Sequence, residues 1–151
     1  MESKALKVGW IVMLAMAVYG LAIALLWVFG TKAVFAPAFT TFTEQSWSDF
    51  VAVSPKAAHL QLMTSRLVAA MAVAVSIIGI FMVLNSYRKG EKWSWYAFLV
   101  SGVIVWGSNL AYDITIASAS GLVLMTIGFI LLVIGLVVPA RAILGGEAAK
   151  K

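Results

Sequence analysis

Long uncharged stretches alternate with short charged segments along this chain. Asp, Glu, Lys, Arg and His are absent from residues 8–31, 67–87, 93–112 and 114–140, and each stretch is 20 residues or longer. A helix needs about 20 apolar residues to cross a hydrocarbon core of roughly 30 Å. Residues 128–138 are apolar on every face of a helix, whereas a helix at the surface of a soluble protein has a polar face. The pattern therefore predicts an all-α membrane protein with four transmembrane helices.

We expect the whole chain, residues 1–151, to be a single membrane domain folded as an antiparallel four-helix bundle. The expected spans cover approximately residues 8–30, 64–87, 93–113 and 118–143. Pro139 falls in the last turn of the fourth span, where the backbone bond that proline removes is least needed. Small residues form close-packing faces on three spans. They are Ala17, Gly20 and Ala24 on the first, Ser65, Ala69, Ala72, Ser76 and Gly79 on the second, and Gly121, Gly128 and Gly135, one heptad apart, on the fourth. Such faces favour tight contact between neighbouring helices.

The outer loop, residues 31–63, is the only long connection, and we expect it to contain a short interfacial helix. Thr43 or Ser46 can cap this helix, and Trp47 would then lie at the depth of the lipid head groups. Ser54-Pro55 is typical of a helix start, because Pro is tolerated at the first helical position and Ser can cap it. The second transmembrane helix is therefore expected to begin near this pair, before it enters the membrane.

Basic residues are distributed unevenly between the two sides of this arrangement. The side that carries both termini and the loop between the second and third helices holds eight of the eleven basic residues: Lys4, Lys7, Arg88, Lys89, Lys92, Arg141, Lys150 and Lys151. The other side holds Lys32, Lys56 and Arg66. Because Lys and Arg near the ends of spans favour the cytoplasmic side, we expect a multi-pass protein of the cell membrane with both termini cytoplasmic.

The net charge of +5 and the pI of 9.7 follow from this topology and from contact with anionic lipids of the bilayer. No basic patch is interleaved with stacking aromatic residues, so nucleic acid is not an expected partner.

Several of the polar residues near the spans gather toward the outer ends of the second and third helices. Arg66 and Asp113 are expected at the same depth, and antiparallel neighbouring helices would bring them together. His59 lies seven residues before Arg66, and Asn109 lies one turn below Asp113. Together with Trp106, these residues are candidates for an outward-facing pocket for an anion, a polar head group or a quinone-like ring. The alternative is that Arg66 and Asp113 form a structural clamp and that His59 is only solvated.

Counting the reactive side chains argues against several kinds of chemistry. The chain has no Cys and one His, so it cannot form a bis-histidine haem site and is unsuited to zinc, copper or di-iron. No span carries an acid or base at mid-membrane depth, as proton-coupled transporters do. Ser76 and Ser101 are expected to pack as small residues with hydroxyls bonded to their own helix. We therefore expect no catalytic residue, no metal and no cofactor.

The segment at residues 87–95 reads Y-R-K-G-E-K-W-S-W. It resembles a turn of the form Y-R-x-G-E-x-W-x-W that a group of small prokaryotic four-helix membrane proteins of unknown function carries between the second and third helices. Gln45-Ser46-Trp47 and Ser54-Pro55 in the outer loop are similar as well. The resemblance implies the four-helix membrane fold, and it brings no activity, cofactor or site residue with it.

Three functions fit these observations. The first is a non-catalytic subunit or scaffold, in which the close-packing faces contact other membrane subunits or a second copy of the chain. The second is a protein that binds a lipid, a quinone or another small molecule in the outer pocket. The third is a transporter or channel built from several copies, with Ser101, Ser108 and Asn109 as the polar stripe of the third helix.

Overall fold

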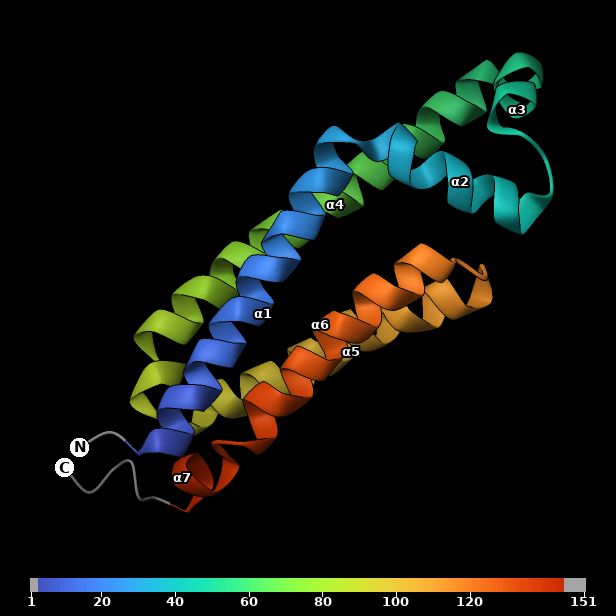
Figure 1. Cartoon of the computed structure of the whole chain (residues 1–151). Helices are drawn as coiled ribbons and strands as arrows, with labels where there is room; N and C mark the ends of the chain where they lie inside the picture. Colours follow the sequence, from blue (N-terminus) through green and yellow to red (C-terminus); the bar gives the residue numbers. More distant parts are fainter. Residues whose placement is uncertain (1–2, 146–151) are drawn as a thin grey trace.

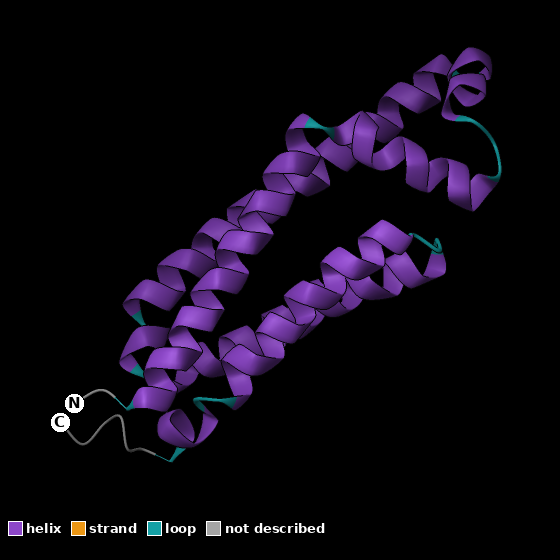
Figure 2. Cartoon of the chain, viewed as in Figure 1, coloured by secondary structure: helices purple, strands orange, loops and turns teal. Residues whose placement is uncertain are grey.

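The computed structural model describes residues 3–145, which form helices and no strand (Figures 1 and 2). In chain order the elements are α1 (Lys4–Phe29), α2 (Thr31–Thr43), α3 (Trp47–Val53), α4 (Pro55–Asn85), the 3-10 turn η1 (Tyr87–Lys89), α5 (Lys92–Thr115), α6 (Ala119–Val137) and α7 (Ala140–Leu144). Four segments are long and apolar enough to cross a membrane: α1, α4 with η1, α5 and α6. The prediction of an all-α protein with four such helices is confirmed.

Proline residues lie at the start of α4 and just beyond the end of α6. α4 begins at Pro55, as the Ser54-Pro55 pair predicts, and its 31 residues extend over about 46 Å at 1.5 Å per residue. α6 ends at Val137 and does not continue to residue 143. Pro139 lies between α6 and α7, and its ring packs directly on the Cα of Gly9 in α1. The proline therefore separates two helices, because it provides no backbone N–H and its ring is held in this contact.

The outer loop is mostly helical. α3 has Ser46 as its N-cap, with the Oγ accepting a hydrogen bond of 3.1 Å from the backbone N–H of Asp49. α2 was not predicted, and it contains Pro37. Phe35 and Phe39 of α2 pack edge-on against the Trp47 ring of α3, with ring centroids 5.4 and 5.1 Å apart. These aromatic contacts fold α2 and α3 together beside the first turns of α4.

The four long helices form an open arrangement. α1 packs against both α4 and α6, and α6 packs against α5. Figure 1 shows the α1–α4 pair and the α5–α6 pair meeting where α1 begins and diverging toward the other end. We call the first end, with η1 and α7, the closed end, and the other, with α2, α3 and the turn between α5 and α6, the open end. Beyond η1, α4 and α5 diverge.

At the closed end, large side chains are bonded to the backbone of a neighbouring helix. The Tyr87 hydroxyl donates a hydrogen bond of 2.6 Å to the Gly135 carbonyl, and the Trp95 indole N–H donates one of 2.9 Å to the Leu136 carbonyl. Met13 of α1 lies against Gly135 and, like Tyr87, is fully buried. The ends of α4 and α5 are therefore tied to α6, where hydrocarbon could not satisfy these polar groups.

The uneven charge distribution follows the two ends. Six of the eight basic residues of the first group lie in or beside elements of the closed end: Lys4, Lys7, Arg88, Lys89, Lys92 and Arg141. Arg88 also lies over the Trp10 ring, 5.3 Å from its centroid. Lys150 and Lys151 lie outside the described residues. Lys32, Lys56 and Arg66 belong to α2 and to the first half of α4.

Candidate ligand-binding cleft

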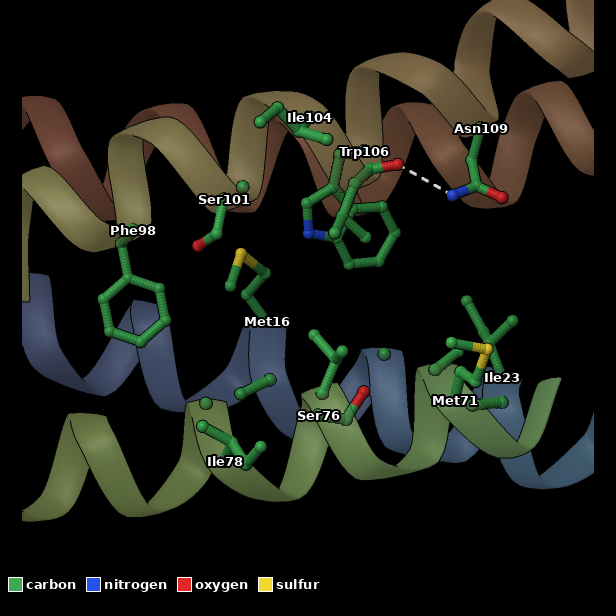
Figure 3. Close-up of a pocket in the computed structure, with 18 of the residues that line it drawn as sticks. Met16, Ile23, Met71, Ser76, Ile78, Phe98, Ser101, Ile104, Trp106 and Asn109 are labelled. Atoms are coloured by element: carbon green, nitrogen blue, oxygen red, sulfur yellow. Dashed lines mark hydrogen bonds between the residues drawn. The ribbon is translucent and has the colours of Figure 1, made fainter. Parts of the chain in front are cut away.

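A cleft of about 440 Å³ separates the two helix pairs in the middle of the molecule. α1 and α4 form one wall and α5 forms the other (Figure 3). Small-molecule pockets in proteins usually measure about 300 to 1,000 Å³. None of the residues that line the cleft is charged, and most are apolar. The cleft is therefore suited to an uncharged, largely apolar molecule.

Small residues on α1 and α4 leave this space empty. Ala17, Gly20 and Ala24 of α1 and Ala72 and Gly79 of α4 all line the cleft. The sequence singled these residues out as close-packing faces. Here those faces are only partly used for helix contact: Ala17 and Ala24 are buried and Gly20 is half-buried, yet all three border the empty volume.

Trp106 of α5 holds the two helix pairs apart. Its ring lies so close to the Cα of Gly128 in α6 that any side chain there would run into it. On its other side the ring stacks on Tyr19 of α1, with centroids 6.2 Å apart and planes 16° apart. The Tyr19 hydroxyl in turn donates a hydrogen bond of 3.1 Å to the Leu124 carbonyl of α6. A large ring thus sits between α1 and α6, and the cleft opens beside it.

The polar side chains of α5 in the cleft are bonded to their own helix. The Ser101 hydroxyl donates to the Ala97 carbonyl at 2.6 Å, and the Ser108 hydroxyl donates to the Ile104 carbonyl at 2.5 Å. The Asn109 amide donates to the Val105 carbonyl at 2.7 Å, as Figure 3 shows. Such bonds satisfy the donors of these side chains within the helix.

Three other donors in the cleft have no partner among residues 3–145. The Ser76 hydroxyl has no hydrogen-bond partner among these residues. The sequence had predicted a bond to its own helix, such as the one that the Ser101 hydroxyl makes. The Trp106 indole N–H likewise has no acceptor among these residues, and the Trp27 indole N–H is buried without one. Unsatisfied donors are costly in an apolar environment.

The structure separates the five residues proposed from the sequence. Trp106 and Asn109 both line the cleft. His59 and Arg66 are exposed on α4, although each directly follows a buried residue, Ala58 and Ser65. The sequence predicted that α4 and α5 are neighbours at the depth of Arg66 and Asp113. They are not in contact there, because α4 packs on α1 and α5 packs on α6.

Asp113 is 7% exposed and packs against Gly121 in the first turn of α6. A carboxyl group is favourable there, because a helix N-terminus carries partial positive charge and unpaired N–H groups. Ser118 caps the same turn by accepting a hydrogen bond of 3.2 Å from the Gly121 N–H. Asp113 is thus accommodated by α6 without Arg66.

Sequence reasoning missed the α1 and α4 walls of the cleft. The signal was present in their small residues, but small residues do not show whether a helix or an empty space faces them. Among the described residues, no group of three or more His, Cys, Asp or Glu side chains could hold a metal ion. Comparisons with protein-family models, curated proteins and solved structures find no match to this chain.

Proposed function

We propose that this protein is an integral membrane protein that binds an apolar molecule of the bilayer in the cleft between its two helix pairs. The cleft is the observation that carries the proposal: it has the volume of a ligand pocket, and no charged residue lines it. Its two outer walls, α4 and α5, diverge beyond η1. A molecule dissolved in the hydrocarbon can then enter between them without crossing water.

The proposed topology places the closed end at the cytoplasmic face of the cell membrane. The four long helices cross the bilayer as an antiparallel bundle, and α3 lies at the outer interface with its aromatic contacts to α2. The basic residues of the closed end support this orientation. Reporters fused to the C-terminus test this orientation: a fluorescent protein should fluoresce there, and an alkaline phosphatase, which is active only outside the cytoplasm, should be inactive. An active phosphatase fusion would contradict the orientation.

Gly20 offers a direct test of ligand binding. A Cβ at this position would make only ordinary contacts, at 3.4 Å from the Ser76 Oγ and 3.5 Å from the Trp106 ring. Gly20→Leu should therefore fold, while its longer side chain fills the cleft. Gly107→Leu is the matched control, because nothing lies within 4 Å of a Cβ at Gly107.

The measurement is saturable photo-crosslinking of a diazirine-labelled fatty alcohol to the full-length protein in nanodiscs. We expect crosslinks to peptides of the cleft that excess unlabelled alcohol removes. Gly20→Leu should reduce them about tenfold, equivalent to 1.4 kcal/mol of binding free energy. Gly107→Leu should leave them unchanged. Equal crosslinking in both variants would exclude the cleft as the binding site.

A second proposed function is a non-catalytic subunit of a larger membrane complex. One observation favours it: within α4 and η1 only 11% of the most apolar stretch is buried inside the protein. The exposed side chains of this segment, which include Leu67, Val68 and Phe81, can contact either lipid or another subunit. Purification in mild detergent tests this role, which predicts a stoichiometric partner protein. The polar side chains of α5 are bonded to their own helix, so no observation favours a channel among the described residues.

A further inference from the structure

Of the three unpartnered donors in the cleft, Trp27 lies near the end of α1, and the other two, Ser76 and Trp106, indicate which molecule the cleft binds. Resting on the proposed function, we infer that the ligand is an uncharged amphiphile whose carbonyl-type oxygen accepts hydrogen bonds from the Ser76 hydroxyl and the Trp106 indole N–H. A quinone ring and the ester of a neutral lipid both carry such an oxygen.

The two donors lie on opposite walls of the cleft. Ser76 projects from α4 and Trp106 from α5, so they belong to opposite walls. Gly20 of α1 lies between them, because a Cβ there would be 3.4 Å from the Ser76 Oγ and 3.5 Å from the Trp106 ring. Figure 3 shows the Trp106 indole reaching from α5 into the gap, with its nitrogen on the side toward Ser101 and Met16. Both side chains therefore border the part of the cleft beside Gly20, and a ligand that lies there can contact both.

The other polar side chains of α5 in the cleft already have hydrogen-bond acceptors, unlike Ser76 and Trp106. Ser101, Ser108 and Asn109 donate to carbonyls of α5. Ser76 and Trp106 have no such bond among the described residues, although Trp106 is only 7% exposed. In hydrocarbon no water is present to accept from them, and an unpaired donor there is unfavourable. An acceptor on the ligand removes this cost.

The lining of the cleft limits the chemical class of the ligand, because it is uncharged and mostly apolar. Phe98 and Ile78 lie at one side of the two donors in Figure 3, and Ile23 and Met71 lie at the other, so apolar groups flank the donors. A charged head would have no counter-ion among the lining residues and would be strongly disfavoured at this depth. An uncharged oxygen between apolar parts is the group that matches both observations.

The test compares two probes that differ only in their oxygens: an alkyl quinone and an alkylbenzene with the same chain. Both are titrated as tritiated compounds against the full-length protein in nanodiscs. Ser76→Thr and Ser76→Val form a shape-matched pair, because only Thr retains the hydroxyl. Trp106→Phe removes the indole N–H, and Thr115→Val is the control, because the Thr115 hydroxyl donates to the Ala111 carbonyl of its own helix and does not line the cleft.

We expect Ser76→Val and Trp106→Phe each to weaken quinone binding about threefold to tenfold, the effect of one neutral hydrogen bond. Ser76→Thr and Thr115→Val should bind the quinone as the unmodified protein does, and alkylbenzene affinity should be the same in the Ser76 and Thr115 variants. Because the Trp106 ring is also a packing element, the Ser76 pair decides the result if Trp106→Phe does not fold.

Two results would overturn the inference in distinguishable ways. If both probes bind the unmodified protein and Ser76→Val equals Ser76→Thr, the cleft binds apolar molecules without using these donors. If neither probe binds, the proposed function fails together with the inference. If a diacylglycerol displaces the quinone, an ester oxygen can also accept from Ser76 and Trp106. If it does not, only the ring ketone of the quinone is accepted at these donors.

Discussion

The closed end and the cleft use the same kinds of residue in opposite ways. At the closed end, Gly9 and Gly135 receive the Pro139 ring and the Met13 side chain, so each missing Cβ is filled by a neighbour. In the cleft, Gly20 borders a space of about 440 Å³. Aromatic donors differ less sharply: Tyr87 and Trp95 donate to backbone carbonyls of α6, whereas the N–H groups of Trp10 at the closed end and of Trp106 in the cleft have no acceptor among the described residues.

This difference suggests a division of roles along the helices. Filled glycines and the bonds of Tyr87 and Trp95 to α6 fix how the two helix pairs are joined at the closed end, although the Trp10 N–H there is buried without an acceptor among the described residues. An unfilled space and unpaired donors further along lower the stability of the isolated chain, and bound ligand can recover that free energy. Substitutions at the closed end should therefore change stability, and substitutions in the cleft should mainly change binding.

The largest effect is expected for Gly9→Ala, because a methyl group there would overlap the Pro139 ring. Overpacking at such a contact costs about 2 to 3 kcal/mol. Gly107→Ala is the control, since its Cβ would meet nothing within 4 Å, and it should be neutral or stabilising by up to about 1 kcal/mol. Unfolding by sodium dodecyl sulfate in mixed micelles, followed by circular dichroism, measures both. Equal stability of the two variants would show that the closed end is not tightly packed.

Tyr87→Phe should have the next largest effect. It removes the hydroxyl that donates to the Gly135 carbonyl and leaves this buried acceptor unpaired, at a cost of about 1 to 2 kcal/mol. Tyr96→Phe is the control, because Tyr96 is 53% exposed and makes no side-chain hydrogen bond among the described residues. The same unfolding titration applies. A loss no greater than that of the control would mean that the bond contributes nothing to joining α4 and α6.

Ala117→Gly should stabilise the open end. Ala117 has a φ of 52° in the turn between α5 and α6, a conformation that costs an L-residue roughly 1 to 2 kcal/mol. Glycine removes this strain but loses more entropy on folding, so the net gain should be about 0.5 to 1 kcal/mol. Ala111→Gly, within α5, should instead lose a similar amount. A gain for both, or a loss for both, would contradict the strained turn.

The spans of this protein could be predicted from the sequence because they depend on the solvent around each helix. A bilayer requires long uncharged stretches, and those at residues 8–31 and 67–87 lie largely within α1 and α4. The start of α4 was also predictable, since Ser54-Pro55 acts through local geometry. α2 was missed because its aromatic contacts with Trp47 are made by a segment whose sequence, with Pro37 and several Thr, does not favour a helix.

The site was predicted only in part, because it depends on which helices are neighbours. Trp106 and Asn109 lie on the helix face that the sequence singled out, and both line the cleft. Arg66 was assigned to the same pocket on the assumption that α4 and α5 are in contact. Small residues mark faces that allow close approach, but they do not specify the partner, and Gly128 received the Trp106 ring in place of a helix backbone.

The smallest predicted effect concerns Asp113 and decides how the open end is held. If Asp113 acts only on the first turn of α6, Asp113→Asn should cost about 0.5 kcal/mol or less, the size of a helix-terminus interaction. Arg66→Gln should then cost nothing, because Arg66 is exposed on α4. In a double-mutant cycle measured by the same unfolding titration, the two changes should be additive. A coupling energy of 1 kcal/mol or more would instead indicate an ion pair between α4 and α5, which would close the open end across the mouth of the cleft. Additivity would leave the entrance between these helices free for a ligand from the bilayer.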